Sequence, residues 1–298
     1  MGDGRMKLFD LHCDTLLCAY LAGKELSGNG LHVDLERAKD FEEYRQVLAV
    51  FSEDHLDGDS CYAQFDRVMD YYERLPRPIP SFHPIIGVEG GKLLMGDLAR
   101  LDHLYERGVR ILTLVWGEVS CMGGAFHTDV GLSEFGEQVV RRCFALGIVP
   151  DLSHASDPMI DRVLTLAEQE RRAVIASHSN FRAICPHKRN LTDEQALRIA
   201  RLGGVIGVNL VIPHLCSGKE HCDIDAVIDH IEYGIRLCGR DAVALGCDMD
   251  GTAPLPDGIE GVGDLPKLYE KLANRLGSLD LADAVFYENA KKALSRIL

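Results

Sequence analysis

The sequence has 298 residues, enough for one large buried core or for two smaller domains. Its 32 Lys and Arg residues and 46 Asp and Glu residues give a formal net charge of −14 at pH 7, which would repel nucleic acid. The chain has no apolar run near the ~20 residues of a membrane span, and its first residues lack the pattern of a signal peptide. We therefore expect a cytoplasmic protein that acts on small molecules, without nucleic-acid or membrane partners. Its 10 Cys residues form no C-x-x-C pair, so we expect free thiols.

Apolar, β-branched runs alternate with amphipathic segments along the whole chain. The runs predict strands at residues 8–13, 46–51, 84–88, 109–116, 148–153, 173–177, 204–210 and 242–247. The segments between them predict helices at residues 62–75, 98–107, 134–146, 158–169, 193–202, 224–238 and 265–276. Because the strand runs are apolar throughout, both faces of the sheet are expected to be buried, which is typical of parallel strands joined by helices. The sequence therefore predicts an α/β fold, a (β/α)₈ TIM barrel in which residues 1–298 form a single domain.

Two long segments, residues 20–40 and 120–136, contain Gly and lack clear periodicity. They predict loops or short helices, and loops that follow barrel strands commonly line the substrate pocket. Residues 282–298 predict a terminal helix that closes the barrel.

Polar side chains follow five of the predicted strands, at the carboxyl end in each case. They are His12, Asp14, Glu89, His154, His178 and Asp248. Active sites of barrels of this class lie at that face and take residues from several strands. Taken alone, His154 could cap a helix and His178 could lie in a hydrogen-bonded turn, but together the six residues predict a metal site.

Imidazole nitrogens and carboxylate oxygens are both ligands of Zn²⁺ and similar ions. A single closed zinc site uses four ligands, so the number of candidates favours two metal ions that share a carboxylate. Glu89 is our choice for the shared ligand, because neighbouring glycines at 87, 90 and 91 allow close approach of the backbone. Two such cations would make hydroxide available near neutral pH, which predicts hydrolysis. For Asp250 we favour a role in structuring the loop.

Other polar residues have weaker patterns. Arg189 lies in the loop after the sixth predicted strand, where its guanidinium could bind a substrate carboxylate; the alternative is an exposed arginine beside Lys188. The residues His214, Cys216, His221 and Cys222 match no common zinc spacing, so we expect a surface loop there. The remaining histidines, including His127, are assigned to solvent, loops or the core.

Seven motifs then identify a family. They are D-x-H-x-D at 10–14, G-V-E-G-G at 87–91, R-x-L-T-L at 110–114, D-L-S-H-A-S at 151–156, S-H-S at 177–179, K-R-N at 188–190 and G-C-D-M-D-G at 246–251. With these motifs the chain resembles the membrane dipeptidase (renal dipeptidase) family of zinc metallopeptidases, in the amidohydrolase superfamily, nearly from end to end.

The resemblance implies a barrel with two Zn²⁺ ions, for which other divalent ions could substitute. One ion would bind His12, Asp14 and Glu89, and the other would bind the bridging Glu89, His154 and His178. The implied reaction is hydrolysis of dipeptides, including those with a C-terminal D-residue, by a hydroxide that bridges the metals. By position, Arg189 would bind the substrate carboxylate, and Asp248 would handle protons and the free amine. Family members are commonly homodimers, so a homodimer is expected.

The chain departs from its mammalian relatives at one position. They have a His just after the L-T-L run, whereas this chain has Val115 and then Trp116, whose indole N–H could donate a hydrogen bond to the substrate. Two other functions therefore stay open. One is a different binuclear amidohydrolase acting on N-acyl amino acids, lactones or small amides, and the other is a barrel that binds metal or peptide without turnover.

Overall fold

The protein forms a closed barrel of parallel strands. The computed structural model describes residues 6–76 and 79–295. Seven parallel strands lie side by side in the order β5-β4-β3-β2-β1-β7-β6. They are β1 (Lys7–Cys13), β2 (Glu43–Phe51), β3 (Phe82–Glu89), β4 (Val109–Thr113), β5 (Val149–Asp151), β6 (Ile206–Val208) and β7 (Val243–Leu245). Between the two edge strands, β5 and β6, lies the sixth predicted strand, in which Ile175 bridges to Asp151 and Ala176 to Ile206. These parallel bridges close the ring and confirm the predicted (β/α)₈ fold.

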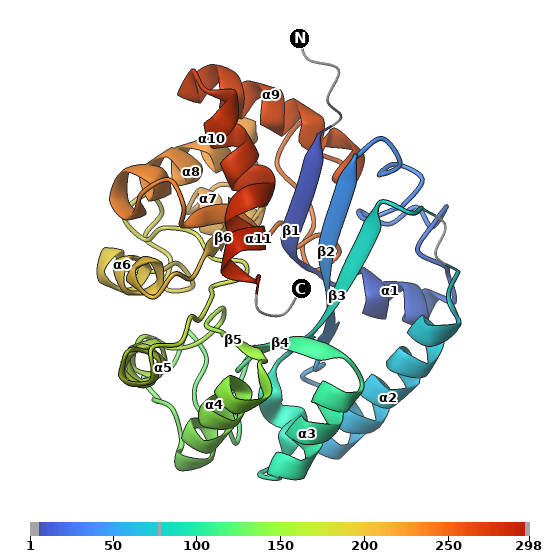
Figure 1. Ribbon diagram of the computed structural model, residues 1–298, viewed down its shortest axis with the longest axis vertical. Coiled ribbons are helices and arrows are strands. Elements are labelled where there is room, and N and C mark those ends of the chain that lie inside the picture. Colours follow the sequence, from blue (N-terminus) through green and yellow to red (C-terminus); the bar gives the residue numbers. More distant parts are fainter. Residues whose placement is uncertain (1–5, 77–78, 296–298) are drawn as a thin grey trace.

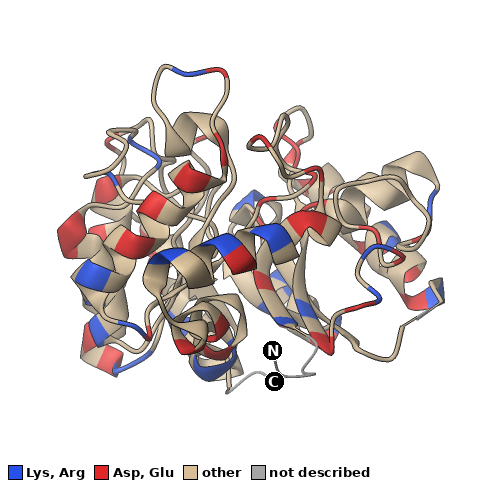
Figure 2. Ribbon diagram, turned by 90° about the horizontal axis from the view of Figure 1, so that it is seen from above, with Lys and Arg blue, Asp and Glu red and all other residues tan. Residues whose placement is uncertain are grey.

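Helices surround the strands as an outer layer (Figure 1). The α-helices of the described residues are α1 (Thr15–Ala22), α2 (Gly58–Arg74), α3 (Leu98–Glu106), α4 (Glu134–Leu146), α5 (Asp157–Glu170), α6 (Asp193–Arg201), α7 (Ile212–Leu215), α8 (Ile224–Cys238), α9 (Leu265–Leu276), α10 (Leu279–Asp283) and α11 (Asn289–Ala293), and the last of them lies across one end of the barrel. All seven predicted helices are present. Helix α5 begins where Ser156 accepts a hydrogen bond from the Met159 N–H, and α6 begins with a capping box of Thr192 and Gln195. Acidic and basic residues are interspersed over the helices and loops (Figure 2).

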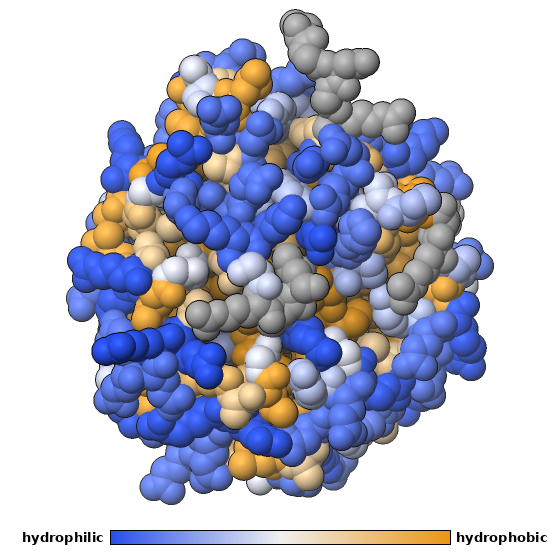
Figure 3. Space-filling model, viewed as in Figure 1, coloured by the Kyte–Doolittle hydropathy of each residue, from blue (hydrophilic) through white to orange (hydrophobic). Residues whose placement is uncertain are grey.

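The core has two parts because each strand has two faces. The larger part lies between the strands and the helices, and the smaller part fills the barrel with inward-facing residues such as Phe9, Leu11 and Val47. Tyr287 and Ala290 from the C-terminal segment also belong to this inner part. The segment packs against β1 and β7, as Figure 1 shows for α11. The predicted terminal helix therefore covers one end of the barrel as α10, a π-helical turn and α11, while its last three residues lie outside the described part. That face is largely hydrophilic on its surface (Figure 3).

A bulge near the end of β1 decides where His12 points. Phe9 and Leu11 belong to the inner core, but Cys13 belongs to the outer core, so the alternation of side chains reverses between residues 11 and 13. The register against β2 shifts over the same residues, between Asp10 and Cys13. Such a bulge re-aims one side chain. Strict alternation would have placed His12 on the outer side with Leu8, whereas the bulge turns it toward the barrel axis.

Candidate metal centre and substrate cavity

Five side chains meet at the carboxyl end of the barrel and form two overlapping groups that could hold metal. One group is His12, Asp14 and Glu89, and the other is Glu89, His154 and His178; within each, the ligand atoms lie within 4.8 Å of one another. These are the two ligand sets that the family resemblance implies. His12, His178 and Asp248 form a third group.

Glu89 is the residue common to both ligand sets, and its two oxygens face different partners. Oε2 lies 3.5 Å from His12 Nε2, while Oε1 lies 2.9 Å from His154 Nε2 and 3.2 Å from His178 Nε2. As the last residue of β3, Glu89 is fixed by pairing with Phe51 of β2 and Thr113 of β4. A carboxylate held in this way is suited to bridging two ions.

Two buried atoms of this cluster have no hydrogen-bond partner among the described residues. His12 Nε2 and Asp14 Oδ1 are shielded from solvent and make no hydrogen bond. An unsatisfied buried polar atom costs about 1–3 kcal/mol, so native structures rarely keep one without a function. Because both atoms are good ligands and lie in the same group, the residues fit a divalent metal ion.

A second layer of hydrogen bonds orients His178. Its Nδ1 lies 2.7 Å from Ser177 Oγ, and the Ser177 hydroxyl donates to Asp151 Oδ2 at 2.6 Å. Since the serine proton goes to the carboxylate, Nδ1 carries the hydrogen that it donates to Oγ, and Nε2 keeps its lone pair for the cluster. Asp151 is itself fixed by the Thr113 hydroxyl and by the backbone N–H of Ser153. Such outer partners fix the tautomer of a metal-ligating histidine.

Two of the site residues have strained backbones. His154 has φ 69° and Asp248 has φ 59°, in the left-handed region of backbone conformation that residues other than glycine rarely adopt. Backbone hydrogen bonds stabilise both conformations: His154 C=O accepts from the Phe126 N–H at 2.7 Å, and the Asp248 N–H donates to His12 C=O at 3.1 Å. Strain of this kind clusters at functional sites.

The cluster has more negative than positive groups. Burial raises the pKa of Asp14 to about 6, with the Glu89 charge adding to the effect, and burial raises the pKa of Asp248 well above its usual value. Burial also acts to raise the pKa of Glu89, but the charge of His12 and the close imidazoles of His154 and His178 hold it well below its usual value. Burial, followed by the charge of Arg189, lowers the pKa of His154 to about 4. Divalent cations would neutralise these carboxylates and favour their charged forms.

A cavity of about 570 Å³ opens onto the cluster. Six of the eight residues singled out from the sequence line it, namely Asp14, Glu89, Trp116, His154, Arg189 and Asp248. His12 and His178 do not line it, but they complete the ligand groups. The cavity wall is apolar where Leu17, Leu21, Phe51, Phe126 and Val211 contribute, as is typical of small-molecule sites.

Arg189 is buried in this cavity and is not an exposed surface arginine, since only 4% of it is accessible to solvent. Its Nη1 donates to Ser179 Oγ at 2.8 Å and its Nη2 to His178 C=O at 3.0 Å, while Nε has no partner among the described residues. Burial lowers its pKa to about 10, at which the guanidinium still carries its charge near neutral pH. The remaining N–H groups are available to a ligand.

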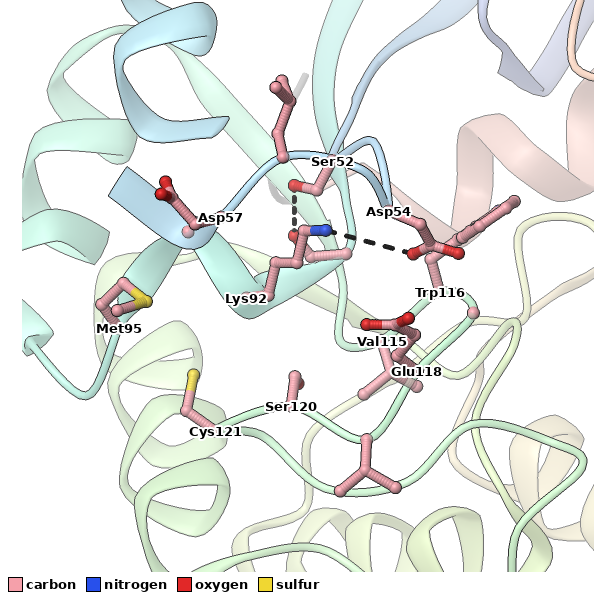
Figure 4. Close-up of a pocket in the computed structure, with 15 residues that line it drawn as sticks. Ser52, Asp54, Asp57, Lys92, Met95, Val115, Trp116, Glu118, Ser120 and Cys121 are labelled. Carbon is pink, nitrogen blue, oxygen red and sulfur yellow. Dashed lines mark hydrogen bonds and ion pairs between the residues drawn. The ribbon is translucent and has the colours of Figure 1, made fainter. Parts of the chain in front are cut away.

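Trp116 lies beside the cluster. Its ring stacks edge-on against Phe51 at 4.5 Å between ring centres and lies 6.0 Å from the His154 ring. The residue also lines a second, smaller cavity of about 250 Å³, where Lys92 Nζ approaches Asp54 at 4.0 Å (Figure 4). Trp116 and Asp54 therefore belong to the wall shared by the two cavities.

Sequence reasoning did not single out two histidines of the cavity. His127 and His214 both line it. Their positions in the sequence could have indicated this. His127 lies in the loop predicted at residues 120–136, and His214 lies four residues after a predicted strand. Asp250 agrees with its expected loop role, because its carboxylate accepts from the Thr15 hydroxyl and from the His32 and Val33 N–H groups.

Several known proteins are similar to this chain in sequence or in fold. Human dipeptidase 3 is 34% identical over 225 residues, which are 72% of this chain and 44% of that protein. Mouse dipeptidase 3 is 36% identical over 200 residues, which are 64% of this chain and 40% of that protein. The matched region thus spans less than half the length of these curated relatives. Within residues 6–76 and 79–295, no helix has the length and apolar character needed to cross a membrane.

Two solved structures match almost the whole chain. The metallopeptidase dipeptidase AC superposes with a TM-score of 0.89 at 25% identity, over 98% of both chains. A metallopeptidase from Rhodobacter sphaeroides, bound to a phosphinate mimic of the dipeptide L-Ala-D-Ala, gives a TM-score of 0.89 at 25% identity over 99% of this chain and 100% of that chain. The model of the membrane dipeptidase family, peptidase family M19, matches residues 80–297. With more than half of its length matched, the chain belongs to the membrane dipeptidase family of metallopeptidases.

Proposed function

We propose that this protein is a zinc-dependent dipeptidase that accepts dipeptides with a C-terminal D-residue. The observation that supports the proposal most strongly is Glu89, whose two oxygens face two separate sets of ligand atoms beside a cavity that contains Arg189. The L-Ala-D-Ala mimic bound to the structural relative indicates the same class of substrate. In this proposal, His12, Asp14 and Glu89 bind one ion, and Glu89, His154 and His178 bind the other.

The metal ions would supply Lewis acidity, which lowers the pKa of a water molecule and stabilises negative charge at the scissile carbonyl. In this proposal, Asp248 transfers the proton. Its Oδ1 lies 3.7 Å from His12 Nε2 at the edge of the cluster, and its raised pKa suits a group that takes up a proton and releases it again. Asp248 would accept a proton from the attacking water, pass it to the leaving amine and contact the free amine of the substrate.

Arg189 would bind the terminal carboxylate of the substrate. The strand order places the bridging segment of Ala176, from which the Arg189 loop follows, across the barrel from β2. In this proposal, the substrate is fixed at its carboxylate by Arg189 and at its amine near Asp248, and both residues line the same cavity. Longer peptides would leave a buried charge unpaired, which is costly. Trp116, beside His154, would contact the substrate near the scissile bond, and residues 1–298 would act as one catalytic domain, expected as a homodimer.

The experiment is hydrolysis of L-L and L-D dipeptides by the zinc-loaded protein, with the same compounds N-acetylated as a matched panel. Cleavage of the free dipeptides that stops on chelation supports the proposal. Turnover of the acetylated compounds alone would instead favour an amidohydrolase of N-acyl amino acids, which remains the second candidate because a metal site by itself does not select the leaving group.

A further inference from the structure

His214 lines the substrate cavity and is linked to Arg189 through a neighbouring histidine. It belongs to the short helix α7, and its ring lies 4.8 Å from that of His187, whose Nδ1 accepts from the Arg189 N–H at 3.2 Å. Both His214 and Arg189 line the cavity. The residue is half-buried in the cavity wall.

The hydrogen bonds of Asn209 fix the tautomer of His214. Asn209 Oδ1 accepts from the backbone N–H of Val211 at 3.1 Å, and its Nδ2 donates to the backbone C=O of His178 at 3.1 Å. These two backbone groups determine which amide atom is oxygen and which is nitrogen. The same Nδ2 lies 3.3 Å from His214 Nδ1, so Nδ1 must accept a hydrogen bond and cannot carry a hydrogen.

His214 Nε2 must then carry the hydrogen of a neutral ring. Nε2 makes no hydrogen bond to any of the residues that the structure describes. Burial and the nearby charge of Arg189 lower the pKa of His214 to about 2, which agrees with a neutral ring near pH 7. The ring is therefore an unused N–H donor in the cavity, without charge and with a fixed orientation.

The Arg189 guanidinium has too few free N–H groups to satisfy a carboxylate fully. Of its five N–H groups, one already binds Ser179 Oγ and another binds His178 C=O. A carboxylate offers about four acceptor positions, and each position left empty in a buried site weakens binding. A neutral donor beside the arginine adds a hydrogen bond without adding positive charge near the metal ions.

We propose that the Nε2–H of His214 is a second donor to the terminal carboxylate of the substrate and acts together with Arg189. This inference rests on the proposed dipeptidase function. It makes His214 a substrate-binding residue that selects a C-terminal carboxylate. Because the bond is made equally in the bound substrate and in the transition state, its loss raises KM and leaves kcat nearly unchanged.

The test compares variants of His214 on L-Ala-D-Ala. His214→Phe keeps a ring without a donor, and His214→Gln keeps an N–H donor without the ring. His214→Leu repeats the donor-free measurement in a smaller side chain in case Phe does not fit. The matched control is His221→Leu, because the His221 side chain is 70% exposed and lies outside the cavity. Zinc content and melting temperature of each variant show whether it is folded and loaded.

We expect KM to rise about tenfold or more in the donor-free variants, to return close to the original value in His214→Gln, and to stay constant in the control. An unchanged KM in folded His214→Phe or His214→Leu would overturn the inference, as would a Gln variant no better than Phe. A fall in kcat at constant KM would also overturn it. If the unaltered enzyme cleaves no dipeptide, the proposed function fails and this inference fails with it. If the unaltered enzyme cleaves dipeptides but the variants keep the same KM, the inference about His214 fails and the proposed function stands.

Discussion

Both ends of the barrel contain polar side chains, but the two ends differ in how these side chains are hydrogen-bonded. At the amino end, Asn289 Nδ2 donates to the carbonyls of Arg240 at 2.7 Å and Val243 at 2.8 Å, and Arg45 Nε donates to Glu43 Oε1 at 2.8 Å. At the carboxyl end, His12 Nε2 is buried and makes no hydrogen bond to any described residue. These polar groups of the amino end are thus paired with other described residues of the chain.

This difference indicates which end is built for stability and which for chemistry. Polar groups that satisfy one another add to the free energy of unfolding and leave nothing for a ligand. Unpartnered ligand atoms and several buried carboxylates instead cost stability until a cation binds. We therefore expect metal and substrate to act on the carboxyl end, and substitutions at the amino end to change stability alone.

Removal of the metal is expected to have the largest effect. Chelation should abolish dipeptide hydrolysis and lower the melting temperature, because an ion present at a thousand times its Kd stabilises the fold by about 4 kcal/mol. Calorimetry before and after chelation measures the shift, and added zinc should restore both activity and stability. A melting temperature unaffected by chelation would contradict the assignment of the unpartnered atoms to a metal site.

Glu89→Gln should lower kcat on the order of a thousandfold and reduce the zinc content, because an amide cannot bridge two cations as a carboxylate does. Glu43→Gln is the matched control at the amino end, where Glu43 contacts Arg45. Steady-state kinetics and metal analysis of the two variants compare the ends directly. Equal losses of activity in both variants would remove the distinction between them.

Arg189→Lys should raise KM for dipeptides about a hundredfold, since lysine keeps the charge but loses the planar fork that binds a carboxylate. Substrates whose C-terminus is amidated should lose much less. Kinetics on matched acid and amide substrates measure the difference. A similar loss on both would mean that Arg189 supports His178 and Ser179 and does not bind the substrate.

Asn289→Ala should have the smallest effect on function and a measurable effect on stability. It removes the side-chain donor to the buried carbonyl of Val243 and to the part-buried carbonyl of Arg240, which should lower the free energy of unfolding by about 2 kcal/mol. Chemical denaturation measures this loss, and kcat/KM should remain unchanged. A clear change in kcat/KM would show that the two ends of the barrel are coupled.

Much of the site could be predicted from the sequence because the fold is so regular. Once apolar runs are identified as parallel strands, their carboxyl ends must meet on one rim, so Glu89, His154 and His178 were expected together before any coordinates. The same regularity identified all seven predicted helices. The prediction of a strand was less accurate for residues 173–177, which form only single bridges to their neighbours. Pairing of so short a segment depends on the neighbouring strands.

Several decisive features depend on contacts between residues distant in sequence. The bulge in β1 that turns His12 inward is a property of pairing with β2, and no periodicity of residues 7–13 alone predicts it. The donor role inferred for His214 depends on Asn209, whose orientation is fixed by backbone groups of residues 178 and 211.

The sequence by itself determined the barrel, the order of its elements and which residues lie at the carboxyl rim, because hydrophobic periodicity is a local property of the chain and the strands it predicts are all parallel. The tertiary structure decided which buried atoms lack partners, which oxygen of Glu89 faces which histidine, and where the cavity lies. These depend on distances of a few ångströms between side chains from different strands, and only the closed barrel fixes those distances.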